Sequence, residues 1–385
     1  MSKLKVIDLF AGCGGLGEGF KQAGFDVIAS VDWEKACVET LEANFKGKHT
    51  TFHADIRDYD EYLVGNDSLR SIVKREGLDG IIGGPPCQAY SLAGRIRCPS
   101  GMKDDYRNYL FESYIEVIRT LKPSFFVFEN VVGMLSAKPG GIPIVDRLKD
   151  AFEEAGYFIP SITKELVFDL ADYGGPQKRK RVIIFGVRKG RSMKKAMIQV
   201  NEFYGRIKKS TSAPASVYDA IGDLPILKPL KQHEKNKSHV INSEDPLHSP
   251  RFHNKRDIEI FRLLSEDAKS RNPKYKSVAA LKKLYEEKTN LKSNVHKYFV
   301  LDQHKPSNLI PAHLHKDGLR HIHYDPAQAR SITMREAARL QTFPDKFKFV
   351  GSQGDIYKMI GNAVPPLLGK KIAKAVACAL KLSKN

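Results

Sequence analysis

Cysteine is scarce in this chain of 385 residues, and the cysteines present form no recognisable framework. There are five of them: Cys13, Cys37, Cys87, Cys98 and Cys378. Their number is odd, none belongs to a Cys-x-x-Cys pair, and none has a histidine partner at zinc-ligand spacing. Disulfide-rich domains and zinc sites normally show such spacing. We therefore predict neither structural disulfides nor a bound metal.

Long apolar runs and internal repeats are also absent from the sequence. No run approaches the roughly 20 apolar residues that a membrane-spanning helix needs, and an apolar strand follows Met1 to Lys3 without a signal peptide. We expect a cytoplasmic protein. The length suffices for two domains of about 100–200 residues each, so two lobes and a cleft are predicted.

Acidic residues are too few to balance the basic ones. The sequence has 63 Lys and Arg against 44 Asp and Glu, a net charge of +19. Residues 1–187 carry 24 basic and 26 acidic groups, residues 188–329 carry 28 and 15, and residues 330–385 carry 11 and 3. Lysines also serve solubility, but a near-neutral part joined to a strongly basic part favours a nucleic-acid partner.

The N-terminal region is predicted to form a strand, a glycine turn and a helix. Residues 5–10 are mostly apolar, and the following turn contains Gly12-x-Gly14-x-x-Gly17, the spacing of a dinucleotide-binding fingerprint. Glycines at this spacing let the backbone approach a nucleotide at the N-terminus of a helix. A single match of this kind does not identify a function.

Two further predicted strands lead to acidic residues. Residues 27–31 are followed by Asp32, placed for ribose hydroxyls, and by Trp33, the only tryptophan in the chain. An indole there can stack on adenine, although a lone tryptophan is more often simple core. A third strand ends near Asp55, placed to accept from an adenine amino group. These features fit a nicotinamide dehydrogenase as well as a methyltransferase.

One thiol follows two prolines. The strand-like run 78–82 continues into Gly83-Gly84-Pro85-Pro86-Cys87-Gln88. The prolines restrict the backbone and remove two amide donors, so the thiol is predicted on a stiff loop at a strand end, where ligands bind in open α/β sheets. The alternative is a buried structural cysteine, which is the commoner fate of a lone Cys.

A second buried-strand pattern, residues 123–128, ends at Glu129-Asn130-Val131. Taken singly, Glu129 fits the neighbour of a helix N-cap or an ordinary loop charge equally well. Together with Cys87 at the preceding strand end, it completes a pair of motifs that resembles the DNA cytosine-5 methyltransferases, which transfer a methyl group to carbon 5 of cytosine. Attack of a thiolate on carbon 6 makes carbon 5 nucleophilic, and an acid at ring nitrogen 3 lowers the cost of the charge. A dehydrogenase has no use for such a thiol.

Pro-Pro-Cys-Gln followed by Glu-Asn-Val resembles the DNA cytosine-5 methyltransferases of bacterial restriction-modification systems. The resemblance covers nearly the whole chain except its basic middle. It implies an α/β fold with a doubly wound, mostly parallel, Rossmann-like sheet and an inserted smaller DNA-recognition domain. The implied domains are a catalytic domain (1–187), a target-recognition domain (188–325) and a returning segment that completes the catalytic domain (326–385).

The resemblance also implies roles for individual residues. Cys87 resembles the nucleophile, Glu129 the partner of nitrogen 3, and Arg179 and Arg181 the holders of the target cytosine and its phosphates. The implied cofactor is S-adenosylmethionine. The residues that resemble its pocket are Phe10, Ala11, Gly12, Gly14, Gly15, Leu16, Asp32, Trp33, Asp55, Ile56, Pro85, Leu110, Asn362 and Val364. Residues 91–105 resemble the family's mobile catalytic loop.

The implied partner is double-stranded DNA, methylated within a specific sequence on a flipped-out cytosine by a monomer, with a cognate restriction endonuclease as a further partner. Two alternatives stay open. One is a tRNA cytosine-5 methyltransferase, because RNA-acting relatives share both motifs; the large basic insert favours DNA. The other is a non-catalytic cofactor-binding DNA module, which is expected to have lost Cys87 or Glu129. No residue code gives the recognition sequence.

Residues 190–325 lose the strand-helix alternation of the first part. An amphipathic helix is predicted over 257–270. The four histidines between His233 and His253 lack metal-ligand spacing, which favours solvated or DNA-facing positions over a metal site.

The tail carries two recognisable segments. Thr333, with Glu336 three residues later, forms a capping box that starts a helix ending before Pro344. Residues 357–366 resemble the family's late motif, which folds back on the first glycine turn, so we expect a core built from both ends of the chain.

Overall fold

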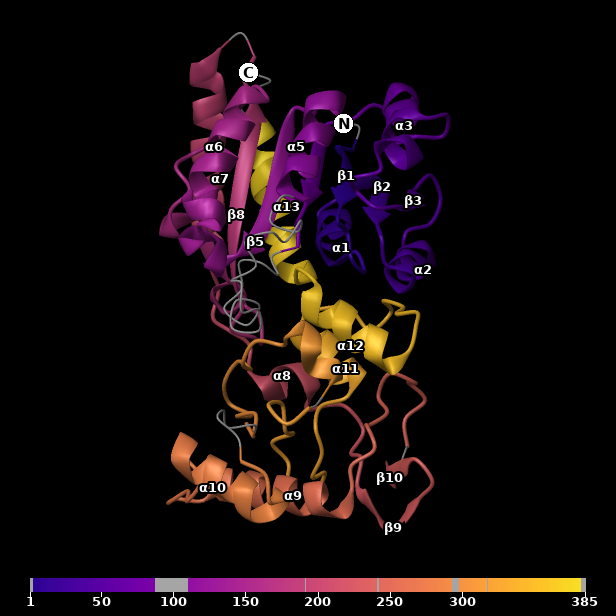
Figure 1. Ribbon diagram of the computed structural model, residues 1–385, viewed down its shortest axis with the longest axis vertical. Coiled ribbons are helices and arrows are strands. Elements are labelled where there is room, and N and C mark those ends of the chain that lie inside the picture. Colours follow the sequence, from indigo (N-terminus) through magenta and orange to yellow (C-terminus); the bar gives the residue numbers. More distant parts are fainter. Residues whose placement is uncertain are drawn as a thin grey trace.

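The computed structural model describes residues 3–86, 110–190, 192–240, 242–292, 298–316 and 318–381. Its strands are β1 (Lys5–Leu9), β2 (Asp26–Asp32), β3 (Thr50–His53), β4 (Gly80–Gly83), β5 (Phe125–Val131), β6 (Tyr157–Phe158), β7 (Val167–Asp169), β8 (Lys180–Arg188), β9 (Pro229–Glu234) and β10 (Lys237–His239). Its α-helices are α1 (Gly15–Gln22), α2 (Lys35–Asn44), α3 (Leu69–Glu76), α5 (Leu110–Leu121), α6 (Ile144–Glu154), α7 (Met193–Lys209), α8 (Val217–Ile221), α9 (Lys255–Lys269), α10 (Val278–Thr289), α11 (Met334–Leu340), α12 (Gln353–Asn362) and α13 (Pro366–Lys381). Figure 1 shows that these elements divide between two lobes, as the length predicts.

The first lobe is built on an eight-stranded sheet in the order β3-β2-β1-β4-β5-β8-β6, with β7 paired to β8. Strands β1 to β5 pair in parallel, whereas β8 runs antiparallel to its neighbours. The strand order reverses between β1 and β4, and ligands bind at such switch points. The doubly wound, mostly parallel α/β sheet predicted from the sequence is confirmed.

Short apolar runs form the central strands because both faces of the sheet are covered. Every residue of β4, and every residue of β5 up to Asn130, is buried. Phe126 stacks on Phe152 of α6, with ring centroids 4.3 Å apart. On the opposite face, Phe185 of β8 stacks on Phe203 of α7 at the same distance. A continuous apolar run is therefore required here, and an alternating pattern would not suffice.

The C-terminal helix completes the first lobe, as predicted. Helix α13 packs along α1 and α7, and the α1–α13 approach is very close. An added Cβ at Gly19 would lie 2.5 Å from the carbonyl oxygen of Pro366. The first and last described helices therefore share one core, with Phe20 of α1 and Ile372 of α13 both fully buried in it.

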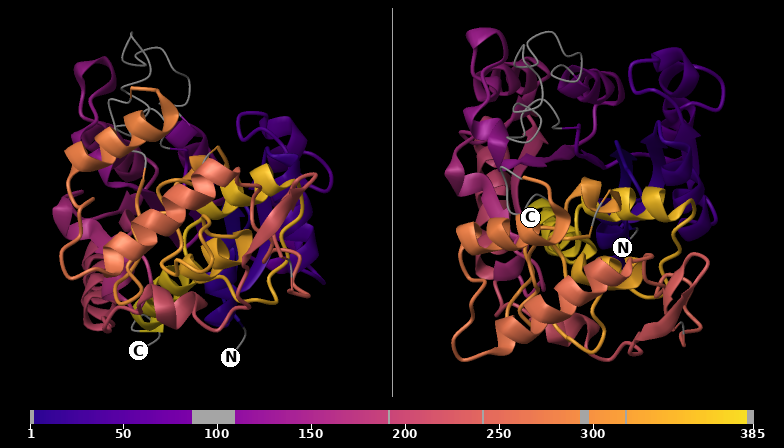
Figure 2. Two further views of the ribbon diagram at one scale, coloured as in Figure 1. Left: turned by 90° about the horizontal axis from the view of Figure 1, so that it is seen from below. Right: turned by 60° about the horizontal axis from the view of Figure 1, so that its bottom comes forward.

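The second lobe, residues 212–362, holds two smaller cores. Helices α8, α11 and α12 form one of them, which also takes in Cys13 and Cys37 of the first lobe. Helices α9 and α10 form the other. Figure 2 shows that α9 and α10 lie at one end of this lobe's lower surface and the β9–β10 hairpin at the other. Thus α11 and α12 pack in the second lobe, and only α13 returns to the sheet.

Helix α7 is the main element that the sequence analysis missed. It lies in the basic middle, yet its buried residues Val200, Phe203 and Ile207 belong to the core of the first lobe. The domain division after residue 187 stays a prediction, and this packing groups α7 with the sheet. Helix α9 and the capping box of α11 are confirmed: Thr333 Oγ1 accepts from the Glu336 amide (3.2 Å), and the Glu336 carboxylate accepts from the Thr333 amide (2.7 Å).

The prediction for the histidines of the basic middle is wrong where they can be described. His239, His248 and His253 are buried rather than solvated. The two ring nitrogens of His248, for example, lie 3.1 Å from Thr333 Oγ1 and 2.8 Å from the carbonyl of Pro225. The His248 ring thus connects a loop of the second lobe to Thr333, the residue that caps α11. The side chain of His233 lies outside the described part.

None of the helices in the described ranges is both long and apolar enough to cross a bilayer.

Candidate active site

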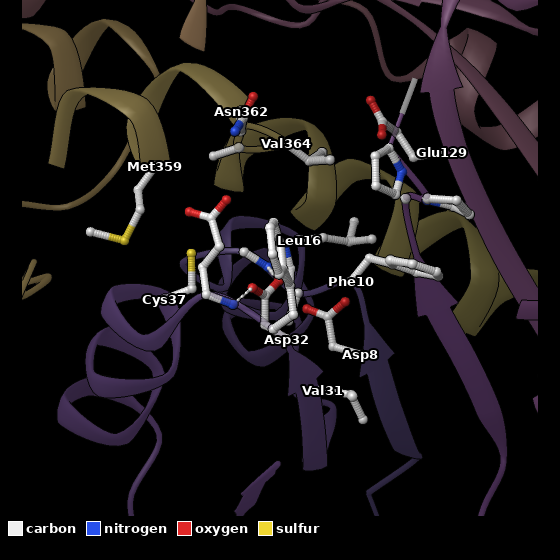
Figure 3. Close-up of a pocket in the computed structure, with 18 of the residues that line it drawn as sticks. Asp8, Phe10, Leu16, Val31, Asp32, Cys37, Glu129, Met359, Asn362 and Val364 are labelled. Atoms are coloured by element: carbon white, nitrogen blue, oxygen red, sulfur yellow. Dashed lines mark hydrogen bonds between the residues drawn. The ribbon is translucent and has the colours of Figure 1, made fainter. Parts of the chain in front are cut away.

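A cavity of about 480 Å³ opens at the switch point of the sheet. Its walls come from the carboxyl ends of β1, β2 and β5, from residues that follow β3 and β4, and from the end of α12 with the stretch that joins it to α13. Figure 3 shows Asp32 and Cys37 of the first lobe facing Met359 and Asn362 across the cavity, with Glu129 at its other end. A cavity of this volume suits a ligand of nucleoside size.

The glycine turn after β1 forms one wall. Phe10 and Gly12 have φ angles of 54° and 55°, a left-handed conformation that is unfavourable for the non-glycine Phe10. The Gly12 amide donates to Asp32 Oδ2 (2.7 Å), which ties the turn to the end of β2. Phe10, Ala11, Gly12 and Leu16 all line the cavity.

The corner after β2 forms the adjoining wall. Asp32 Oδ1 accepts from the Glu34 amide (2.9 Å). Burial raises the pKa of Asp32 to about 6, although the amides of Glu34 and Gly12 act in the opposite direction. Trp33 lines the cavity with 64% of its surface exposed, so it is not a core residue. The corner thus offers a carboxylate and an indole side by side.

Asp55 and Ile56 line the cavity beyond β3. The Arg57 guanidinium donates to both carboxylate oxygens of Asp55, at 2.9 and 2.6 Å. These bonds hold the pKa of Asp55 below its ordinary value and fix the orientation of its carboxylate. Pro85, Leu110, Asn362 and Val364 also line the cavity.

Gly14 and Gly15 lie behind the described walls of the cavity, and their part in binding the cofactor stays a prediction. Gly14 precedes α1 with φ 88°, and an added Cβ would lie 2.7 Å from the Phe45 ring. At Gly15 an added Cβ would lie 2.3 Å from the carbonyl oxygen of Val364. Both glycines allow close packing behind the wall, so they shape the cavity indirectly.

The loop after β4 lies beside the end of β5, because Gly83 pairs with Phe128 in the parallel register. Asn130 Nδ2 donates to the Pro85 carbonyl (3.3 Å). The Glu129 carboxylate lies against Gly84, where an added Cβ would be 2.5 Å from Oε2.

Gly84, Pro85 and Pro86 all line the cavity, and so does Glu129. Cys87, the next residue in the chain, and the loop 91–105 lie outside the described residues. The structure therefore brings the start of the Pro-Pro-Cys segment and Glu129 to one cavity wall.

Arg181 of β8 forms an ion pair with Glu129 of β5, the antiparallel neighbour of β8. Its Nε lies 2.6 Å from Glu129 Oε1, and both side chains are about nine-tenths buried. Gln177, Arg179 and Arg181 are buried while Lys178 and Lys180 are exposed, as the strand period predicts. A fixed guanidinium thus orients the carboxylate at the cavity.

Arg179 has a different environment from the one expected. It is 1% exposed, and its guanidinium donates to the carbonyls of Ile310 (3.1 Å), Gly361 (2.9 Å) and Ala363 (2.8 Å). A guanidinium held in this way braces the returning chain against β8. Arg179 also lines the cavity, and its assignment to the target cytosine or its phosphates stays a prediction.

The sequence analysis did not select several residues that line the cavity, notably Asp8, Glu34, Cys37, Lys358 and Met359. Asp8 had a signal, because it is an acidic residue inside an apolar strand. It accepts from the Gly17 amide (3.1 Å), and burial raises its pKa to about 8. No sequence signal pointed to Glu34 or Lys358, because their contact joins positions far apart in the chain.

The fold and the cavity define a class: a Rossmann-like α/β enzyme whose nucleoside-sized pocket continues to a carboxylate beside a Pro-Pro-Cys loop. The chain belongs to the family of C-5 cytosine-specific DNA methylases, whose family model matches residues 4–378. It is accordingly a DNA cytosine-5 methyltransferase.

Individual relatives agree with this membership. The type II methyltransferase M.Bpa9945I of Bacillus paralicheniformis is 35% identical, with 96% of this chain and 98% of that protein covered. The type II methyltransferase M1.HphI of Haemophilus parahaemolyticus is 32% identical over 99% of this chain and 88% of that protein. A prophage-encoded protein of E. coli of known structure shares the fold, with a TM-score of 0.67 at 24% identity, over 98% of this chain and all of that one.

Proposed function

We propose that the protein methylates carbon 5 of a cytosine within a specific duplex DNA sequence, with S-adenosylmethionine as methyl donor and Cys87 as a covalent nucleophile. One observation carries the proposal. Glu129 lies against Gly84, three residues before Cys87, on a wall of the same cavity that Asp32 and Trp33 line. An acid for the cytosine ring and a pocket for a nucleoside are thus contiguous.

The residues around the cavity fit the cofactor. An exposed indole suits an adenine face, and the neighbouring Asp32 and Asp55 carboxylates suit ribose hydroxyls and an adenine amino group. Asn362 and Val364 would hold the opposite side. When bound, S-adenosylmethionine supplies an electrophilic methyl group on a sulfonium.

The chain's own groups would act on the base. The Cys87 thiolate adds to carbon 6, the electrons of the ring double bond move to carbon 5, and carbon 5 accepts the methyl group. Glu129, held by Arg181, binds ring nitrogen 3 and stabilises the charge that develops there. Loss of the proton from carbon 5 then expels the thiolate and restores the ring.

Carbon 6 of a cytosine stacked inside the duplex is not accessible to a protein thiol, so the base must leave the duplex. Flipping costs a few kcal/mol, which contacts to DNA must offset. The surplus of positive charge after residue 187 supports a polyanionic partner for this purpose. A monomeric state, a cytoplasmic location and a partner restriction endonuclease stay predictions.

Methyl transfer from labelled S-adenosylmethionine to duplex DNA and to tRNA, measured in parallel, tests the proposal. We expect incorporation into DNA, none into tRNA, and loss of at least about a thousandfold in rate for Cys87→Ser, since a hydroxyl is a far weaker nucleophile at neutral pH. Methylation of tRNA alone would favour the RNA alternative. Activity of Cys87→Ser equal to that of the unmodified protein would refute the covalent mechanism.

A further inference from the structure

An ion pair joins the two lobes at the edge of the cavity. Lys358 Nζ, on α12, lies 2.7 Å from Glu34 Oε1, at the corner after β2. Both residues line the cavity, while their side chains keep 39% and 26% exposure respectively. The pair therefore lies at the solvent-accessible rim of the cavity.

Each partner is attached to a different wall. The Glu34 amide donates to Asp32 Oδ1 at 2.9 Å, so Glu34 belongs to the corner that presents Asp32 and Trp33. Lys358 lies on α12, four residues before Asn362 on the opposite wall. Figure 3 shows these walls facing each other, with Asp32 below and Asn362 above. The ion pair thus spans the cavity from one wall to the other.

The interactions of Lys358 differ from those of the other basic residues around the cavity. The other basic residues that line its described walls are Arg179, bound to three backbone carbonyls, and Arg181, paired with Glu129. Lys358 is the lining cation at the corner of Asp32 and Glu34. An exposed ion pair contributes little to stability, so this pair can open and close without unfolding either lobe.

We propose that the Glu34–Lys358 pair is a strap that closes the rim of the cavity and slows release of the bound S-adenosyl cofactor. The inference rests on the proposed function, because it takes the cavity to be the cofactor site. While the pair is formed, the Asp32–Trp33 corner and α12 are held together. When it opens, the two walls separate at the rim and the cofactor can leave.

A direct electrostatic effect of the Glu34 and Lys358 charges on the bound cofactor would respond differently to substitution of these residues. S-adenosylmethionine carries a net positive charge, so loss of the Glu34 charge and loss of the Lys358 charge would alter its binding in opposite directions. A strap is broken equally by either loss. The two single variants Glu34→Gln and Lys358→Met therefore distinguish the explanations, and the double charge reversal Glu34→Lys with Lys358→Glu restores the strap with inverted polarity.

Stopped-flow fluorescence of Trp33, the only tryptophan in the chain, measures cofactor dissociation directly. We expect both single variants to release S-adenosylmethionine about two- to fivefold faster, as loss of one partly exposed ion pair allows. Added salt should accelerate release from the unmodified protein but not from the variants. Charge reversal should return the rate to within about twofold of the original, and Lys305→Met, which breaks a 2.7 Å pair with Asp302 outside the cavity, should change nothing.

Unchanged dissociation in both single variants, or changes of opposite sign, would overturn the strap. Failure of the unmodified protein to bind S-adenosylmethionine, checked by equilibrium dialysis with labelled cofactor, would instead overturn the cofactor assignment of the proposed function. The two failures are therefore separable in one set of samples.

Discussion

The close contact between Gly15 and Val364 shapes the cavity at the start of α1. Gly15 has no side chain, and the Val364 carbonyl occupies the space that a Cβ would take, at 2.3 Å. Backbone atoms cannot move aside as the end of a flexible side chain can. The glycine therefore sets the distance between the first turn and the returning chain, which places Val364 on the cavity wall.

Gly15→Ala should consequently destabilise the protein by about 1–3 kcal/mol, the usual cost of overpacking, and weaken cofactor binding. Urea unfolding and equilibrium dialysis measure the two effects. Gly205→Ala is the matched control: Gly205 lies within α7 and has no atom within 4 Å of an added Cβ. That change should stabilise the protein by about 0.5–1 kcal/mol. Equal stability of the Gly15 variant and the unmodified protein would contradict the close approach of Gly15 to the Val364 carbonyl.

Arg179 and Arg181 show how two residues of one type, two positions apart, take different roles. Both face the interior from β8 or just before it. Arg181 reaches the Glu129 carboxylate, whereas Arg179 reaches carbonyls of the returning chain. The strand period predicts their shared orientation. Only the tertiary structure decides what each guanidinium meets.

At the scale of elements, α11 is held by a buried polar network. Arg330 donates to both carboxylate oxygens of Glu336, at 2.7 and 2.6 Å, and both residues are at most 1% exposed. His323 Nε2 lies 3.5 Å from the same carboxylate. Such a pair is costly to bury and is strongly destabilising when one partner is removed. The network therefore fixes how α11 meets the loops of the second lobe.

The buried histidines make the second lobe sensitive to acid. Burial lowers the pKa of His253 to about 3, of His321 to about 4 and of His323 to about 3, and the nearby Arg330 and Arg251 act in the same direction. In the unfolded chain these rings take up protons near pH 6.5. Below that pH these rings bind more protons in the unfolded state than in the native state, so their contribution to stability falls as the pH drops from about 6.5 towards 4.

We expect each buried ring to lower the free energy of unfolding by about 1 kcal/mol per pH unit between about pH 6 and 4, whereas Asp8 and Asp32, whose pKa values are raised to about 8 and about 6, contribute slopes of the opposite sign below those values. Urea unfolding at pH 7.5, 6.5 and 5.5 measures this slope. His253→Gln should lower stability at pH 7.5 yet reduce the slope, because one titrating ring is gone. A slope unchanged in this variant would contradict the assignment.

For the whole molecule, the sequence predicted the first lobe well and the second lobe poorly. Strands β1, β2, β4, β5 and β8 are continuous apolar runs at places where both sheet faces are buried, so local pattern and tertiary structure agree. Helix α7 was missed because its apolar residues are dispersed among the lysines of the basic middle.

Long-range contacts account for the remaining differences at the site. The Glu34–Lys358 pair and the carbonyl partners of Arg179 join distant parts of the chain, and no local periodicity encodes them. The same holds for Gly15, whose neighbour Val364 is known only once α13 is placed against α1. Sequence motifs can identify residues near a cavity, but the packing of the two chain ends decides which of these residues line it.

The proposed covalent bond between Cys87 and cytosine is tested most directly by a mechanism-based trap. Duplex DNA substituted with 5-fluorocytosine is incubated with the protein and S-adenosylmethionine, because fluorine at carbon 5 prevents the final proton loss. We expect a complex that resists denaturation, a cross-linked peptide containing Cys87, and no complex with Cys87→Ser, while Cys378→Ser traps as well as the unmodified protein. Absence of the complex, or a cross-link at Cys13, Cys37, Cys98 or Cys378, would contradict it.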